Sequence, residues 1–354
     1  MDIQAIRARL QRSAASPPPG APKRPKRWRK IVLAVCGTLI AVPLLAVGYF
    51  RAAAIQRETQ TAAELAPATG RFVATGQGRI FIQEKGPPAA APVILIHGTA
   101  AWSELWREMI DHLAASGFRV IAVDLPPFGF SDRPADRNYT RSAQAARIAA
   151  LIDALDAKQV MLVGHSFGAG PTVETVMRYP EKVGGLVLIA GALGISEPEP
   201  SAGPSPIVGA VLGTDIVRNA VVATLATNPL MTRRLLSMMI YRKEAADARR
   251  TAVLQRPMTL RGTTPDLGHW LRYFVAPDTT AWSMDRGKYA AIKIKTALIW
   301  GDKDTLTPLP QGRDIQTLIA GSSLTVLPEI GHIPQVEDPA AFAPVLTNAL
   351  RSVQ

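Results

Sequence analysis

The feature that most constrains the fold is a series of short apolar runs separated by stretches with helical periodicity. A continuous apolar run of about five residues is typical of a strand buried on both faces of a parallel sheet. The runs lie at 92–96, 119–123, 159–163, 186–190, 296–300 and 323–327. The helical stretches include 103–115, 142–156, 167–179 and 338–352. This alternation predicts an α/β fold, a mostly parallel sheet with helices on both faces.

A shorter pattern precedes these runs. Residues 71–75 and 79–84 alternate in the manner of strands and flank Gly76-Gln77-Gly78. Two such segments around a glycine-rich turn predict a β-hairpin at the start of the domain. In parallel sheets, binding and catalytic sites form beyond the carboxyl ends of the strands. The residues that follow each apolar run are therefore the candidates for chemistry.

One motif follows the run 159–163 directly and opens a helical stretch: Gly164-His165-Ser166-Phe167-Gly168. It matches the G-x-S-x-G pattern, in which a serine stands on a sharp, strained turn between a strand and a helix. The helix N-terminus behind Ser166 would add positive potential where an oxyanion forms. Its position between a buried strand and a helix makes Ser166 the candidate nucleophile.

A base and an acid follow the last two apolar runs. His332 comes after the run 323–327, and Asp302 and Asp304 come after the run 296–300. With Ser166 they give the chain order Ser, Asp, His. His332 would take the serine proton, and one of the two aspartates would orient the imidazole. An earlier acid, Asp124, ends another run and is interpreted as structural, because the order expects the acid after the serine.

The turn His97-Gly98-Thr99 ends the run 92–96. A backbone N–H after this turn would supply one oxyanion donor, beside the N–H of Phe167. The same three residues also fit a simple turn at the end of a strand.

From about residue 71 to 354 the chain resembles the α/β-hydrolase superfamily. It is most similar to the capped branch that includes serine esterases, cofactor-free haloperoxidases, C–C bond hydrolases, epoxide hydrolases and haloalkane dehalogenases. The segments that carry the resemblance are VILIHGTAAWSELW, VIAVDLPPFGFSDRP, VGHSFGAG, LIWGDKDTLTP and EIGHIPQVEDP.

The resemblance implies specific roles. The pattern G-x-x-D-x-x-x-P points to Asp304 as the acid, and G-H-x-P points to His332 as the base. Thr99 and Phe167 match the two oxyanion positions. Ser166 stands where epoxide hydrolases and dehalogenases carry an aspartate, so their chemistry is disfavoured. The resemblance implies a reaction without a metal or another cofactor.

About 100 residues separate the runs 186–190 and 296–300, far more than an ordinary connection. Their helical patterns, at 214–227, 229–240, 243–255 and 265–275, predict a helical cap at about 193–290. In the family such an insertion covers the active site. We expect Trp102, His165 and Trp270 to line the substrate pocket beneath it.

The N-terminus carries most of the net charge of +12. Residues 1–30 hold nine Lys and Arg against one acid, Asp2, which leaves little basicity for nucleic-acid binding elsewhere. Residues 31–50 contain no charge and are long enough for a transmembrane anchor. The positive-inside rule then predicts a single-pass protein of a bacterial-type inner membrane, with a cytoplasmic tail at 1–30 and the catalytic domain outside. The alternative is a cleaved signal peptide and a secreted domain. Residues 51–70 would form a linker.

Together these features predict a membrane-anchored serine hydrolase that cleaves a small hydrophobic carboxylic ester through an acyl-enzyme. Two alternatives stay open. The same triad could serve C–C bond hydrolysis or haloperoxidase-like perhydrolysis. The fold could also serve a membrane-tethered binding protein without catalysis. The sequence does not indicate an oligomeric state.

Overall fold

The computed structural model describes residues 26–195, 213–275, 278 and 280–354. The chain falls into two compact units, Met1–Ala46 and Val47–Gln354. The predicted basic tail lies outside the described residues up to residue 25, as do residues 196–212 of the predicted cap.

A single eight-stranded sheet organises the described part of the second unit, in the order β1-β2-β4-β3-β5-β6-β7-β8. The pairs β1–β2 and β2–β4 are antiparallel, and all the other pairs are parallel. The strands are β1 Gly70–Thr75, β2 Gly78–Lys85, β3 Pro92–Ile96, β4 Arg119–Val123, β5 Val160–His165, β6 Val183–Ile189, β7 Lys295–Gly301 and β8 Ser323–Leu327. The predicted mostly parallel sheet and the hairpin before it are confirmed.

The core lies on the central strands. Every residue of β3 and of β5 is buried, as their continuous apolar runs predict. By contrast, β8 is at the edge of the sheet and buries only Leu327 fully. The main hydrophobic cluster joins these strands to the inner faces of the flanking helices.

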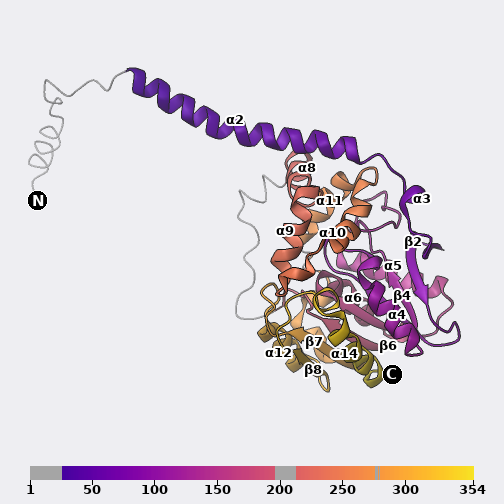
Figure 1. Ribbon diagram of the computed structural model, residues 1–354. Helices are drawn as coiled ribbons and strands as arrows, with labels where there is room; N and C mark the ends of the chain where they lie inside the picture. Colours follow the sequence, from indigo (N-terminus) through magenta and orange to yellow (C-terminus); the bar gives the residue numbers. More distant parts are fainter. Residues whose placement is uncertain (1–25, 196–212, 276–277, 279) are drawn as a thin grey trace, which may run out of the picture. The chain divides into compact units, whose positions relative to one another are not determined.

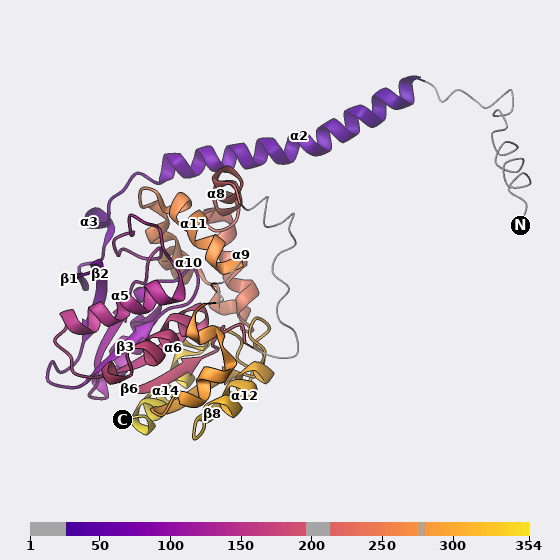
Figure 2. The ribbon, with the colours of Figure 1, turned by 180° about the vertical axis from the view of Figure 1, so that it is seen from behind.

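Helices cover both faces of the sheet. Helix α14 lies in front of it in Figure 1 and packs against α4, while α5 and α6 pack together on the side seen in Figure 2. The flanking helices are α4 Arg107–Ala115, α5 Arg141–Ala154, α6 Ala169–Arg178, α12 Leu309–Leu318 and α14 Pro339–Ser352. A short helix, α13 Pro334–Glu337, precedes α14.

The structure describes four helices between β6 and β7, where the sequence predicts the cap. They are α8 Asp215–Thr224, α9 Pro229–Met239, α10 Ala248–Gln255 and α11 Thr263–Val275. The 3₁₀ turns in the described part of this insertion are η4 Lys243–Ala245, η5 Arg256–Thr259, η6 Trp282–Met284 and η7 Arg286–Ala291. Helices α8 and α11 pack side by side, as do α9 and α10.

The first described helix, α2, runs over Lys26–Arg57. Its stretch Arg27–Arg57 is long and apolar enough to cross a membrane, judged by length and composition alone. Residues 51–57 continue this helix, and α3 Ala62–Leu65 follows, where the sequence analysis expects a linker. The segment is also fixed in place, because the buried carboxylate of Glu58 accepts hydrogen bonds from Thr264. Sequence periodicity does not reveal this tertiary contact.

Candidate active site

Ser166 stands on the turn between β5 and α6. Its φ is +52°, a left-handed conformation that costs free energy for a residue with a Cβ. Flanking glycines allow the turn. A Cβ on Gly164 would come within 2.5 Å of the Thr172 hydroxyl, and one on Gly168 within 2.4 Å of the His97 carbonyl. The strand, the helix and the turn at residue 97 therefore approach closely enough to hold the serine in its strained position.

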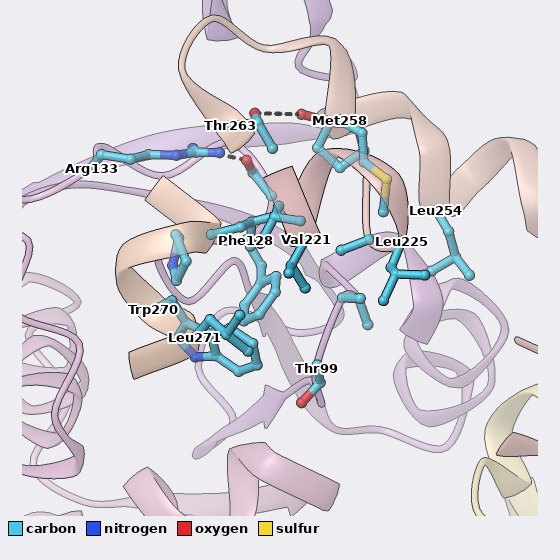
Figure 3. Close-up of a pocket in the computed structure, with 18 residues that line it drawn as sticks. Thr99, Phe128, Arg133, Val221, Leu225, Leu254, Met258, Thr263, Trp270 and Leu271 are labelled. Atoms are coloured by element: carbon cyan, nitrogen blue, oxygen red, sulfur yellow. Dashed lines mark hydrogen bonds between the residues drawn. The ribbon is translucent and has the colours of Figure 1, made fainter. Parts of the chain in front are cut away.

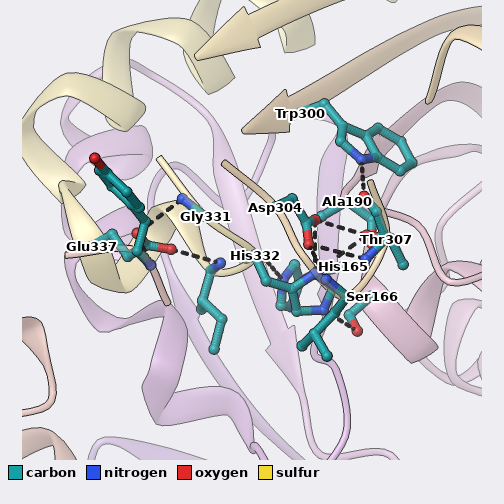
Figure 4. Close-up of polar contacts among 12 residues, drawn as sticks. His165, Ser166, Ala190, Trp300, Asp304, Thr307, Gly331, His332 and Glu337 are labelled. Atoms are coloured by element: carbon teal, nitrogen blue, oxygen red, sulfur yellow. Dashed lines mark hydrogen bonds and ion pairs between the residues drawn. The ribbon is translucent and has the colours of Figure 1, made fainter. Parts of the chain in front are cut away.

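The three residues predicted for catalysis lie in one hydrogen-bonded chain (Figure 4). The Oγ of Ser166 is 2.7 Å from Nε2 of His332, and Nδ1 of His332 is 2.9 Å from Oδ2 of Asp304. All three residues are buried, and Ser166 is only 9% exposed. In this geometry the imidazole can accept the serine proton while the carboxylate holds its other nitrogen.

Asp304 is held as a carboxylate by its neighbours. Its Oδ1 accepts hydrogen bonds from the N–H groups of Leu306 and Thr307, and the Thr307 hydroxyl donates to Oδ2 at 2.7 Å. Burial acts against the charged form, but the hydrogen bonds from His332 and Thr307 outweigh it, so the pKa of Asp304 lies below its ordinary value. The other aspartate of this loop, Asp302, instead pairs with Lys303 at the surface.

His165 lies behind the triad, contrary to the expectation that it lines the substrate pocket. Its Nε2 donates to the backbone carbonyl of His332 at 2.8 Å, and its ring is buried. Burial, together with the proximity of the His332 ring, lowers the pKa of His165 to about 3. The ring is therefore neutral near pH 7, and its contact supports the histidine loop from below. The side chain packs between the rings of Trp106 and His332 instead.

The two predicted oxyanion residues flank the nucleophile. Phe167 follows Ser166 in the chain. Thr99 follows Gly98, where a Cβ would come within 2.9 Å of Cβ of Ser166. The turn that carries Thr99 is held from behind by His97, whose Nδ1 donates to the Gly98 carbonyl while Nε2 accepts from Leu125. The backbone of this turn thus lies directly against the serine.

Asp124 has the structural position that the sequence order suggests. Its buried carboxylate accepts hydrogen bonds from the N–H groups of Ser103 and Phe130, both at 2.7 Å. Burial raises the pKa of Asp124 to about 6, despite these bonds. The residue shapes the loop that borders the pocket.

A cavity of about 200 Å³ begins at Thr99 and extends between the core and the cap (Figure 3). Its walls are almost entirely apolar. The core contributes Thr99, Ala100, Ala101, Pro127, Phe128 and Gly129, and the cap contributes residues of α8, α10, η5 and α11. Trp270 of α11 lines the cavity, as predicted, and its ring lies 5.1 Å from that of Phe167.

Trp102 does not line this cavity, which corrects the sequence prediction. Its indole N–H donates to the Val253 carbonyl, and its ring packs edge-to-face on Phe130. The residue begins the 3₁₀ turn before α4 and faces the hydrophobic contact between the core and the cap. The sequence pattern around an aromatic residue near an oxyanion turn does not show whether its side chain packs in the core or lines a pocket.

Arg133 is the charged side chain among the residues that line this pocket. Its guanidinium donates to the carbonyls of Gly129 and Ser131, and Nε lies 3.9 Å from the carboxylate of Asp266 on α11. Its charge is therefore already engaged in holding the 129–133 loop and the cap together.

Glu337 connects the histidine loop to the cap, and sequence reasoning missed it. Its carboxylate accepts N–H bonds from Gly331 and Ile333, which flank His332, and from Tyr241 and Arg242 at the end of α9 (Figure 4). The segment EIGHIPQVEDP contains this residue, but no local pattern shows which backbone groups its side chain reaches. Thr307 was missed for the same reason.

Comparisons with known proteins identify the family of this fold. A family model described as alpha/beta hydrolase fold matches residues 91–214. The 2-hydroxymuconate semialdehyde hydrolase of Pseudomonas sp. (strain CF600) is 30% identical over 293 residues, which cover 80% of this chain and 94% of that protein. The chain therefore belongs to the α/β-hydrolase family.

Solved structures show the same fold. A meta-cleavage product hydrolase from Pseudomonas fluorescens IP01 superposes with a TM-score of 0.65 at 23% identity, covering 81% of this chain and 99% of that one. A membrane phospholipase A described as a bacterial virulence factor superposes with a TM-score of 0.63 at 23% identity. That match covers 94% of this chain and 99% of the other.

Proposed function

We propose that this α/β-hydrolase cleaves a carboxylic ester with a hydrophobic acyl group. The observation that carries the proposal is the buried hydrogen-bonded chain from Ser166 through His332 to Asp304. His332 takes the serine proton as Oγ attacks the carbonyl, and Asp304 stabilises the imidazolium that results. The N–H groups of Thr99 and Phe167 receive the oxyanion. His332 then protonates the leaving alcohol, and water releases the acyl group by the same steps in reverse order.

The cavity supports an uncharged acyl group. Its lining is apolar, and the guanidinium of Arg133 is engaged by two carbonyls and by Asp266. A carboxylate placed in such a site would lose its hydration without gaining a free cation. An alkyl or aryl chain would instead gain about 25 cal/mol for each Å² that it buries there.

C–C bond hydrolysis is the second candidate, and sequence similarity favours it. The 2-hydroxymuconate semialdehyde hydrolase matches this chain at 30% identity over most of its length. A serine triad can attack a ketone as well as an ester, with a stabilised carbanion in place of the alkoxide leaving group. The substrate of that relative is acidic, however, and the engaged charge of Arg133 supports the ester reading.

Membrane anchoring is also part of the proposal. Helix α2 supplies an apolar stretch of sufficient length, and basic residues precede it, so the positive-inside rule places the catalytic unit outside the cytoplasm. The likeness to the membrane phospholipase A adds support. It covers 94% of this chain, whereas residues 71–354 are only 284 of the 354 residues, so the match extends into the N-terminal segment. A cleaved signal peptide is the alternative that a mass measurement on the mature protein would reveal.

The test is labelling of the full chain with a fluorophosphonate, read by intact mass, beside a Ser166→Ala control. One adduct on the wild type and none on the control is the expected result. The kcat/KM of the active protein is then measured with matched esters and with a vinylogous diketone. Higher kcat/KM for the esters supports the proposal, while preference for the diketone selects C–C hydrolysis. No adduct on folded protein would remove the enzymatic assignment.

A further inference from the structure

The segment after helix α2 crosses the outer side of the cap. Arg57 donates to the Thr227 carbonyl at 2.8 Å, in the turn between α8 and α9. The next residue, Glu58, is 7% exposed and accepts from the N–H and the hydroxyl of Thr264, at the start of α11. Gln60 then bridges to Leu260, which precedes α11. Residues 57–60 are thus bound both to the turn between α8 and α9 and to the start of α11.

The same parts of the cap line the pocket. Leu225 and Ala226, next to Thr227, belong to its lining, as does Thr263, next to Thr264. The pocket also includes Thr99, whose neighbour Gly98 lies against Ser166. The end of α2 is therefore attached beside the pocket, one or two residues from its lining.

The α8–α9 turn, residues 225–230, exposes apolar side chains at this place. Leu230 is 79% exposed and Leu225 is 45% exposed, although both flank the bond between Arg57 and Thr227. Two large aliphatic side chains exposed on one short segment can serve as an interaction surface. Basic side chains lie along the segment that follows α2, since Arg261 donates to the Thr59 carbonyl and Arg256 to the Leu65 carbonyl.

The short distance along α2 between the apolar stretch and Arg57 indicates which partner the turn meets. Arg51 is the first charged residue after the apolar stretch, so a bilayer that holds the stretch ends near it. From Arg51 to Arg57 the helix rises about 9 Å, at 1.5 Å per residue. The turn bound to Arg57 consequently lies within reach of the lipid interface, where leucine side chains enter the acyl region and arginines meet phosphates.

We propose that the α8–α9 turn docks onto the bilayer that holds α2, and that the substrate of Ser166 is an acyl lipid that enters the pocket beside this turn. The proposal rests on the proposed ester chemistry and membrane anchor. It adds a defined surface, Leu225 and Leu230, and a route from the membrane to the nucleophile.

The chain's single cysteine, Cys36, makes a direct test possible. In a Cys36→Ser background, Leu230→Cys is labelled with an environment-sensitive fluorophore, and the full chain is placed in vesicles of phosphatidylethanolamine and phosphatidylglycerol that contain nitroxide lipids. Val326→Cys, an exposed position on β8, is the matched control. We expect quenching at position 230 and none at position 326.

The other outcomes overturn the proposal in distinguishable ways. Equal, weak quenching at both positions in membrane-bound, fluorophosphonate-reactive protein would remove the docking and leave the enzyme in place. A blue-shifted but unquenched label at 230 would assign the turn to a second copy of the chain. Protein that does not remain with the vesicles would remove the anchor, and the docking with it.

A kinetic test uses Leu230→Asp, because Leu230 does not line the pocket. Turnover of a long-chain ester dispersed in the vesicles should fall about tenfold, the cost of withdrawing one leucine from lipid. Turnover of a soluble short-chain ester should be unchanged. An equal fall on both esters would contradict membrane docking, and wild-type inactivity on both would instead contradict the ester chemistry.

Discussion

His165 donates a hydrogen bond to the backbone carbonyl of His332, so the residue beside Ser166 supports the residue proposed to deprotonate it. The two rings lie 5.3 Å apart, and the supporting ring is neutral because burial lowers its pKa to about 3. Its role is to hold the backbone of the histidine loop without competing for the proton.

His165→Leu should therefore lower kcat about tenfold, the cost of one buried hydrogen bond, with little change in KM. His165→Gln can place an amide N–H near the same carbonyl and should recover part of the loss. Fluorophosphonate labelling rates and ester kinetics measure both variants. Equal activity of the leucine variant and the wild type would show that the contact has no positioning role.

Thr307 should be required for full activity through Asp304. Its hydroxyl lies 2.7 Å from Oδ2 of the carboxylate and 3.2 Å from Nδ1 of His332. Thr307→Val removes this donor at constant shape, and we expect kcat to fall about tenfold. Thr307→Ser keeps the hydroxyl and should stay near wild type. If both variants lose activity equally, the methyl group rather than the hydroxyl supports the site.

Glu337→Gln should uncouple the histidine loop from the cap. The carboxylate accepts four backbone N–H groups, and an amide offers one accepting oxygen and a nitrogen that would face donors. We expect both lower kcat and a lower thermal midpoint. The matched control is Glu329→Gln, which removes the same charge from an exposed position three residues before His332. Similar losses in both variants would attribute the effect to net charge.

Because His97 and His165 are buried, we expect the free energy of unfolding to fall in acid. The pKa of His97 is lowered to about 4 and that of His165 to about 3, both by burial, against 6.5 ordinarily. Between pH 6.5 and these values the unfolded chain binds protons that the folded chain excludes. The free energy of unfolding therefore falls as pH decreases, by up to about 1.4 kcal/mol per pH unit for each histidine.

Asp124 opposes this trend. Burial raises its pKa from 3.8 to about 6, so the folded chain binds the extra proton between these values, and this group gains stability as pH falls. Denaturant unfolding followed by tryptophan fluorescence should show a net loss of stability below about pH 6.5, because two histidines outweigh one aspartate. His165→Leu should flatten the slope and Asp124→Asn should steepen it. An unchanged slope in both would contradict the burial of these groups as neutral species.

Much of the fold could be predicted because its strands are buried on both faces. The runs at β3 and β4 match the observed strands residue for residue, since a continuous apolar stretch has few other stable environments. The order of a serine, an aspartate and a histidine could be predicted because each follows a strand, and the carboxyl ends of parallel strands converge. The choice of Asp304 over Asp302 comes from the resemblance to the family.

The remaining parts depend on tertiary contacts that no local pattern encodes. Trp102 and His165 are near the site in sequence, but the direction of each side chain follows from packing against Phe130 and from the pleat of β5. Glu337 acts by accepting hydrogen bonds from backbone N–H groups of other segments, and Thr307 acts through its own hydroxyl. Glu58 lies in the segment that the sequence predicts as a linker, and only its contact with α11 distinguishes it.

The cap takes part in aligning the base. The N–H of His332 donates to the carbonyl of Met239, the last residue of α9, in addition to the bonds made by Glu337. If α9 moved away from the core, His332 would lose this hydrogen bond and its imidazole would lose its alignment. Solvent would enter the site at the same time. We therefore expect that displacement of α9 would stop bond cleavage, and that the reaction would require the cap to be in contact with the histidine loop.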